Sequence, residues 1–185
     1  MRLININMKT TARIAFCGII GALSVVLMFL TGAVPVATIA IPALAGCFLI
    51  PAVAECGAKW GFGVFAVTGI LSFLLATDRE AFLIYVLFFG YYPVLYAVLD
   101  RMKNRKLMYV IKLVIFNAAC VLEALLAVYV FGIPFENIGF LGNLTAVVLL
   151  VLANIVFVLY DHALRGLIAM YFAKFHKMIR KTFRF

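Results

Sequence analysis

A single acidic residue inside a long apolar run is the clearest candidate for chemistry in this sequence. Glu123 lies in the stretch from Leu107 to Phe131, two helical turns beyond Asn117, among mostly aliphatic and aromatic neighbours. An unpaired carboxylate is costly in such surroundings, so Glu123 must bind a ligand or a proton, or pair with a basic side chain of another segment. The sequence leaves binding and structural pairing equally open.

Four further polar side chains within apolar stretches are weaker candidates for a binding site. Asn143 and Asn154 lie in the last long apolar stretch, where asparagine commonly joins helices by hydrogen bonds instead of binding a ligand. Tyr85 and Tyr91 lie in an aromatic series that could offer ring faces and hydroxyls to a planar ligand, although most aromatic residues in such a chain only pack. We include all four in the predicted substrate site.

Charged side chains near the ends of the apolar stretches have structural explanations as well as functional ones. Arg79 could hold an anionic substrate, or it could pair with the acidic residues on either side of it. Lys112 can extend its ammonium group toward the membrane surface, and we interpret it as structural. Asp161 and Arg165 stand four residues apart, a spacing typical of an ion pair on a helix surface. Of these, only Arg79 joins the predicted substrate site.

Motifs for catalysis and for metal binding are missing from the sequence. It contains no P-loop, no His-Glu-x-x-His and no Gly-x-Ser-x-Gly, and it has only two histidines. The Asp161-His162 pair is interpreted as a hydrogen-bonding feature of a helix end. The cysteines stand singly in apolar runs, as small buried hydrophobes; they are Cys17, Cys47, Cys56 and Cys120. We therefore expect no enzymatic activity, no metal ion and no cofactor.

The composition indicates an integral membrane protein. Of 185 residues, 68% are hydrophobic and 12% are charged, whereas about a quarter of the residues in an ordinary soluble domain are charged. The length suits roughly six membrane-spanning helices of about 20 residues and leaves almost nothing for a soluble domain. Membrane orientation and contact with lipid explain the net charge of +9 better than binding to nucleic acid does.

Six apolar stretches predict an all-α membrane protein, a compact bundle of six transmembrane helices forming a single domain over residues 1–185. The stretches are roughly 12–30, 36–54, 60–76, 81–99, 107–131 and 141–159, and a basic tail follows at 174–185. Pro42 and Pro51 lie in the second stretch, which is either a full helix or partly a re-entrant loop. Pro93 lacks an amide hydrogen and is expected to kink the fourth helix.

The distribution of basic residues predicts how these helices are oriented. Of the 16 Lys and Arg residues, 14 lie at the N-terminus, in the second and fourth loops, or beyond the last span. Arg79 lies on the opposite side, and Lys112 lies within a span. Because short cytoplasmic loops carry the excess of positive charge, both termini are expected in the cytoplasm of a multi-pass plasma-membrane protein.

Small residues follow one face of the first apolar stretch. Cys17 and Gly21 stand four residues apart, and so do Gly18 and Ala22. This spacing allows another helix to approach closely. The other helix could belong to the same bundle or to a separate membrane subunit.

The chain as a whole resembles the substrate-binding S components of energy-coupling factor (ECF) transporters. The resemblance rests on the six-span layout, on the basic N-terminus that leads into Ala-Arg-Ile-Ala at 12–15, and on Ile-Pro-Ala-Leu-Ala-Gly-Cys-Phe-Leu-Ile-Pro at 41–51. It implies that the chain captures a vitamin or related micronutrient from outside, in a region that includes Tyr85, Glu123 and Asn143. In that family the first helix docks on a transmembrane coupling subunit, and ATPase subunits drive inward release. The family's Ala-x-x-x-Ala docking pattern would here be Gly18-x-x-x-Ala22, with Cys17 and Gly21 beside it.

Two other functions remain open at this stage. A non-transport scaffold, similar to an MreD-like cell-shape subunit, needs no sealed polar cavity, so Glu123 would matter little to it. An autonomous proton-coupled transporter would use Glu123 as its proton site and would need no ATPase partner. The substrate itself is not identified by any motif in the sequence.

Overall fold

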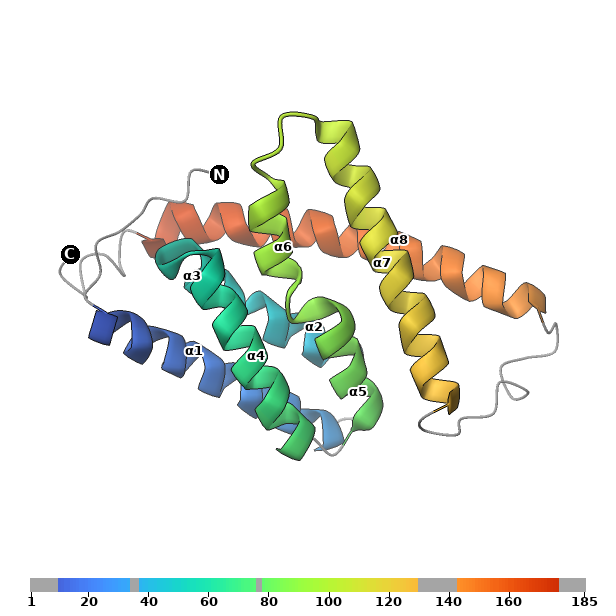
Figure 1. The fold of residues 1–185 in the computed structure, drawn as a ribbon, viewed down its shortest axis with the longest axis horizontal. Coiled ribbons are helices and arrows are strands. Elements are labelled where there is room, and N and C mark those ends of the chain that lie inside the picture. Colours follow the sequence, from blue (N-terminus) through green and yellow to red (C-terminus); the bar gives the residue numbers. More distant parts are fainter. Residues whose placement is uncertain (1–9, 34–36, 76–77, 130–142, 177–185) are drawn as a thin grey trace. The chain divides into compact units, whose positions relative to one another are not determined.

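The computed structural model is all-helical over the residues that it describes, which are 10–33, 37–75, 78–129 and 143–176 (Figure 1). Five helical stretches are long and apolar enough to cross a membrane: Thr10–Ala33, Ala58–Leu75, Arg79–Leu99, Arg105–Leu126 and Val147–Phe175. A shorter apolar stretch covers Ala40–Cys56. The abundance and length of these helices indicate a membrane protein.

The chain divides into two compact units, which are described separately. Unit 1 comprises residues 1–103 and 166–185, and unit 2 comprises residues 104–165. The last long helix, α8 (Asn143–Met170), contributes its final turn to unit 1 and the remainder to unit 2.

Unit 1 is organised around α1 (Thr10–Leu30), which a short 3₁₀ turn, η1 (Thr31–Ala33), follows. α1 lies alongside α4 (Ala58–Leu75) (Figure 1). The side chains between α1, α3 and α4 form an apolar core whose buried members are Phe16, Cys17, Ile20, Leu49, Ala52 and Val64. The opposite face of α1 exposes Ile19, Val26 and Phe29, which a helix in contact with lipid can do without cost.

The second predicted span is helical, but it consists of two short helices. These are α2 (Ala40–Cys47) and α3 (Leu49–Cys56), and Phe48 separates them. Pro42 and Pro51 each lie in the first turn of one of these helices, where an amide hydrogen has no intrahelical partner in any case. Two prolines that looked like signs of an irregular loop therefore fit regular helix. The chain then turns at Gly57, whose φ of 94° favours glycine, and enters α4.

The fourth predicted span is interrupted at its middle. It consists of α5 (Arg79–Ile84), a π-helical turn η3 (Tyr85–Phe89), and α6 (Tyr92–Leu99). Pro93 lies in the first turn of α6, so the helix is broken where proline predicted a kink. At Gly90 a Cβ would lie 2.6 Å from the Phe65 ring, which explains the glycine there.

Unit 2 is a pair of long helices, α7 (Arg105–Tyr129) and most of α8. The Asn104 side chain accepts hydrogen bonds from the backbone N–H groups of residues 106 and 107, at 3.1 and 3.3 Å, and so caps α7. The rings of Phe116 and Phe157 stack between the two helices, with their centroids 4.6 Å apart. The last predicted span, 141–159 or further, corresponds to α8, which continues to Met170 and then into a π-helical turn, η5 (Tyr171–Phe175). The predicted basic tail at 174 therefore begins inside helical structure.

Candidate functional site

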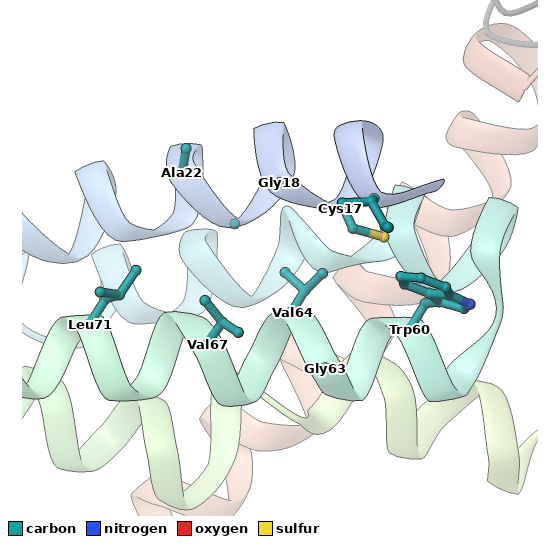
Figure 2. Close-up of a pocket in the computed structure, with 10 residues that line it drawn as sticks. Cys17, Gly18, Ala22, Trp60, Gly63, Val64, Val67 and Leu71 are labelled. Carbon is teal, nitrogen blue, oxygen red and sulfur yellow. The ribbon is translucent and has the colours of Figure 1, made fainter. Parts of the chain in front are cut away.

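The small-residue face of α1 lines an open apolar groove against α4. The groove has a volume of about 400 Å³, and its walls include Cys17, Gly18, Gly21 and Ala22 from α1. Trp60, Gly63 and Val64 are among the residues that α4 contributes, and Figure 2 shows the two helices running alongside each other here. All four residues that the sequence predicted as a docking face thus lie together on one groove.

The glycines determine how open this groove is. A Cβ added at Gly18 or at Gly63 would meet nothing within 4 Å, so both positions face free space. A Cβ at Gly21 would instead lie 3.7 Å from Val64 Cγ1, in ordinary contact with α4. Gly21 therefore lies at the floor of the groove, where α1 and α4 meet. Because Gly18 and Gly63 have no side chains, they leave the groove open on its α1 and α4 sides.

A second feature of unit 1 is the burial of three hydroxyls, two on α4 and one on η3. Thr68 and Tyr85 are fully buried, and Ser72, one turn after Thr68 on the same face of α4, is 1% exposed. Within the described residues none of these three hydroxyl oxygens has a hydrogen-bond partner, although the Thr68 hydroxyl lies near that of Tyr85. Because an unpartnered buried hydroxyl is costly, a water molecule or a polar group of a ligand would be stabilised here.

The other predicted substrate residues of unit 1 lie in different surroundings. Tyr91 is half-buried, and its ring packs edge-on against Phe65, which also contacts the Tyr85 ring. The rings of Tyr85 and Tyr91 therefore both contact the ring of Phe65. Arg79 is exposed and donates a hydrogen bond of 3.4 Å to the backbone carbonyl of Phe73, over whose ring its guanidinium lies.

The remaining predicted substrate residues belong to unit 2. Asn154 and Asn117 exchange two side-chain hydrogen bonds of 3.0 Å, and each amide also donates to a carbonyl of its own helix. This geometry is that of a link between helices. Glu123 is half-buried on α7, one turn after Cys120. The side chain of Asn143 lies outside the described part of the structure.

No protein family matches this chain, and no curated protein or solved structure is significantly similar to it. The geometry of the described residues therefore carries the functional interpretation.

Sequence reasoning did not anticipate a buried polar contact centred on Glu55. The Glu55 side chain has no exposed surface, and its Oε1 atom lies 2.7 Å from both the Tyr171 hydroxyl and His176 Nδ1. Glu55 is at the end of α3, whereas its two partners lie in and just after η5. Because the partners are more than 115 residues away along the chain, no local pattern could have revealed the contact.

A second buried network stabilises unit 2. Lys112 is fully buried, and its ammonium donates to Asp161 Oδ1 at 2.5 Å. It therefore does not reach the membrane surface in the way its sequence position suggested. Arg165 pairs with Asp161 at 3.6 Å, as the spacing of four predicted, and also contacts the Tyr109 hydroxyl. His162 is exposed, and it is Lys112 and Arg165 that pair with its acidic neighbour.

Proposed function

We propose that this chain is the substrate-capturing S component of an ECF-type importer. In this proposal it spans the plasma membrane six times, with α2 and α3 together forming the second span and both termini in the cytoplasm. It binds a vitamin or related micronutrient from outside and releases it inward when docked on a transmembrane coupling subunit with ATPase subunits. The chain itself performs no enzymatic reaction.

The observation that carries this proposal is the groove between α1 and α4. A bundle needs no open groove on its lipid-facing surface for its own packing, and lipid can fill an apolar surface of any shape. Because residues 18 and 63 are glycines, the groove is open enough for close contact with the backbone of a partner helix. A separate coupling subunit within the membrane supplies such a helix.

Two polar features support a ligand-binding role for the same chain. The buried hydroxyls of Thr68, Ser72 and Tyr85 lack partners within the described residues, so a polar ligand group can replace lost hydration there. Glu123 places a half-buried carboxylate on α7. A scaffold subunit has no use for unpartnered hydroxyls in its core, which favours a binding protein over an MreD-like function.

The test is to fill the groove and to measure partner binding. We expect Gly18→Leu and Gly63→Leu to abolish copurification of a coupling subunit and of ATP-hydrolysing subunits, while each variant alone remains folded in detergent. Gly166→Leu is the matched control, because a Cβ at Gly166 also meets nothing within 4 Å but the residue is not part of the groove. Native mass spectrometry of the unmodified protein is expected to detect a tightly held small molecule.

Three results would contradict the proposal in different ways. Transport against a gradient by the purified chain alone in proteoliposomes would identify an autonomous transporter. Copurification of neither a small molecule nor a coupling subunit would favour the scaffold. Equal copurification by Gly18→Leu and Gly166→Leu would mean that the groove is not the docking surface.

A further inference from the structure

A second apolar groove of unit 1 lies between the α2–α3 segment and the end of α8. Its volume is about 390 Å³, and none of the residues that line it belongs to the predicted substrate site or to the docking face of α1. Several of its large apolar side chains are more than a third exposed, so the groove is open to the surroundings of the protein. Its walls include Leu44, Phe48 and Pro51 on one side and Leu167, Met170 and Phe175 on the other.

The wall formed by η5 is held in place by a buried hydrogen bond. Tyr171 lines the groove, and its hydroxyl donates to Glu55 Oε1 at 2.7 Å, which joins η5 to the end of α3. The ring of Phe175 lies nearly parallel to that of Tyr171, with the two centroids 6.4 Å apart. Because the two sides of the groove are joined in this way, its shape does not depend on a bound ligand.

The side chains that line this groove exclude a partner helix. Among the described residues that line it there is no glycine and no alanine, whereas close contact between helices in a membrane depends on small residues. The groove between α1 and α4, with Gly18 and Gly63, differs in this respect. A helix with its side chains is about 10–12 Å wide, and a single hydrocarbon chain is much thinner and more flexible. The occupant that fits between these side chains is therefore an acyl chain.

Positive charge adjoins this groove. Lys174 is exposed and directly precedes Phe175, which lines the groove. Residues 174–185 contain five Lys or Arg and no acidic residue. Lys59 is also exposed, in the first turn of α4 directly after the end of α3. The carboxylate of Glu55 at this end of α3 is buried and hydrogen-bonded, so it does not face a ligand headgroup. The charges here favour an anionic headgroup.

We propose that the groove between the α2–α3 segment and the end of α8 binds one acyl chain of an anionic phospholipid. The headgroup of this lipid lies near Lys174 and is attracted by it and by the basic segment that follows. The bound chain covers apolar side chains of both walls and therefore stabilises the packing of the end of α8 on α2 and α3. This proposal requires only that the protein lies in a membrane, and it is independent of the transport function and of the orientation of the chain.

The first part of the test concerns the headgroup. The full-length protein in an uncharged detergent is titrated with palmitoyl-oleoyl phosphatidylglycerol, or with phosphatidylcholine that carries the same two chains, and native mass spectrometry counts the bound lipids. We expect phosphatidylglycerol to bind at least about fivefold more tightly. Lys174→Gln should weaken its binding by about fivefold and leave that of phosphatidylcholine unchanged. Lys103→Gln is the matched control, because Lys103 is also exposed but does not adjoin the groove.

The second part of the test concerns the acyl chain. Leu167→Trp places a larger side chain in the groove, and we expect it to weaken the binding of both lipids by at least about tenfold, which corresponds to the loss of only two buried methylenes. Leu149→Trp is the matched control, because Leu149 is an exposed leucine of the same helix outside the groove. Thermal unfolding without lipid establishes that each variant is folded. If Leu167→Trp does not fold, Lys174→Gln tests the site without it.

Four results would overturn the proposal. Equal affinity for the two lipids would mean that the headgroup charge is not recognised. Equal binding of phosphatidylglycerol by Leu167→Trp and Leu149→Trp would place the lipid elsewhere on the protein. Equal binding by Lys174→Gln and Lys103→Gln would exclude Lys174 from the site. Displacement of phosphatidylglycerol by glycerol phosphate, which has no acyl chain, would identify a site for free phosphate instead of lipid.

Discussion

Buried acidic side chains are unusual in an apolar chain, and the part of the chain that the structure describes has two that differ in their partners. Glu55 accepts from a tyrosine and a histidine, whereas Asp161 lies between a buried lysine and a partly exposed arginine. Removing one member of such a group leaves the others buried without compensation, which costs more than the contact itself contributes. Substitutions that keep the shape of a side chain but remove its charge or its hydrogen bond therefore test what that side chain contributes to stability.

The first prediction concerns the Glu55 contact. Glu55→Gln keeps the shape of the side chain but removes its charge, and we expect it to destabilise the protein by about 3 kcal/mol. Tyr171→Phe removes one hydrogen bond and leaves His176 in place, so the expected loss is about 1–2 kcal/mol. Thermal unfolding in detergent measures both. A larger loss for Tyr171→Phe than for Glu55→Gln would show that the carboxylate does not organise this contact.

The second prediction concerns the pair of Lys112 and Asp161. Asp161→Leu should cost about 3–5 kcal/mol, because it leaves the buried Lys112 ammonium without this carboxylate. Lys112→Met should cost less, because Asp161 keeps its contact with Arg165. The combination Lys112→Met with Asp161→Leu should be more stable than either single variant, since an apolar pair needs no compensation in this position. A double-mutant cycle on thermal unfolding measures the coupling. If the losses of unfolding free energy in the two single variants add up to the loss in the double variant, Lys112 and Asp161 do not interact directly.

At the scale of the elements, close helix contacts depend on a few glycines. At Gly46 on α2, an added Cβ would lie 2.9 Å from the backbone carbonyl carbon of Phe89 in η3. Backbone cannot move aside as a flexible side chain can. The π-helical turn and α2 thus pack at a distance that only glycine permits, directly next to the buried Tyr85.

The third prediction follows from this contact. Gly46→Ala should cost about 1–3 kcal/mol, because it forces α2 and η3 apart. Gly63→Ala is the matched control on α4, where the Cβ meets nothing within 4 Å and alanine also favours helix. The midpoint temperature of thermal unfolding of Gly63→Ala should therefore equal or exceed that of the unmodified protein. Equal stability of the two variants would mean that α2 and η3 do not pack this closely.

At the scale of the whole molecule, the testable property is orientation in the membrane. The excess of basic residues at the N-terminus, near 101–106 and beyond the last span predicts that these segments face the cytoplasm. Arg79 and Lys103 are both exposed and lie at opposite ends of the fourth predicted span. They are therefore suitable positions for a labelling experiment.

The fourth prediction is that a membrane-impermeant thiol reagent added to intact cells labels Arg79→Cys and not Lys103→Cys. Both substitutions are made in a chain whose four native cysteines are replaced by alanine. Permeabilised cells provide the control, because both positions should then react. Labelling of Lys103→Cys alone in intact cells would show that the topology is the opposite of the predicted one, with the proposed binding region on the cytoplasmic side.

The sequence by itself determined the class of structure. Long apolar stretches form helices because every backbone polar group must be satisfied within the segment when no water is present. The small-residue spacing on α1 and the i,i+4 pair of Asp161 and Arg165 were also predictable, because both follow from the period of one helix. Pro93 marked the break before α6 for the same local reason.

Only the tertiary structure decided which distant residues meet. The contacts of Glu55 with Tyr171 and His176 and of Lys112 with Asp161 each join separate helices. Helical periodicity defines the face on which a side chain lies, but not which other helix covers that face or at what height. The sequence therefore showed that Glu123 and the asparagines were unusual, whereas the packing decided that Asn154 has a partner in Asn117. Among the described residues, it also placed the most deeply buried carboxylate at Glu55, at the end of a helix.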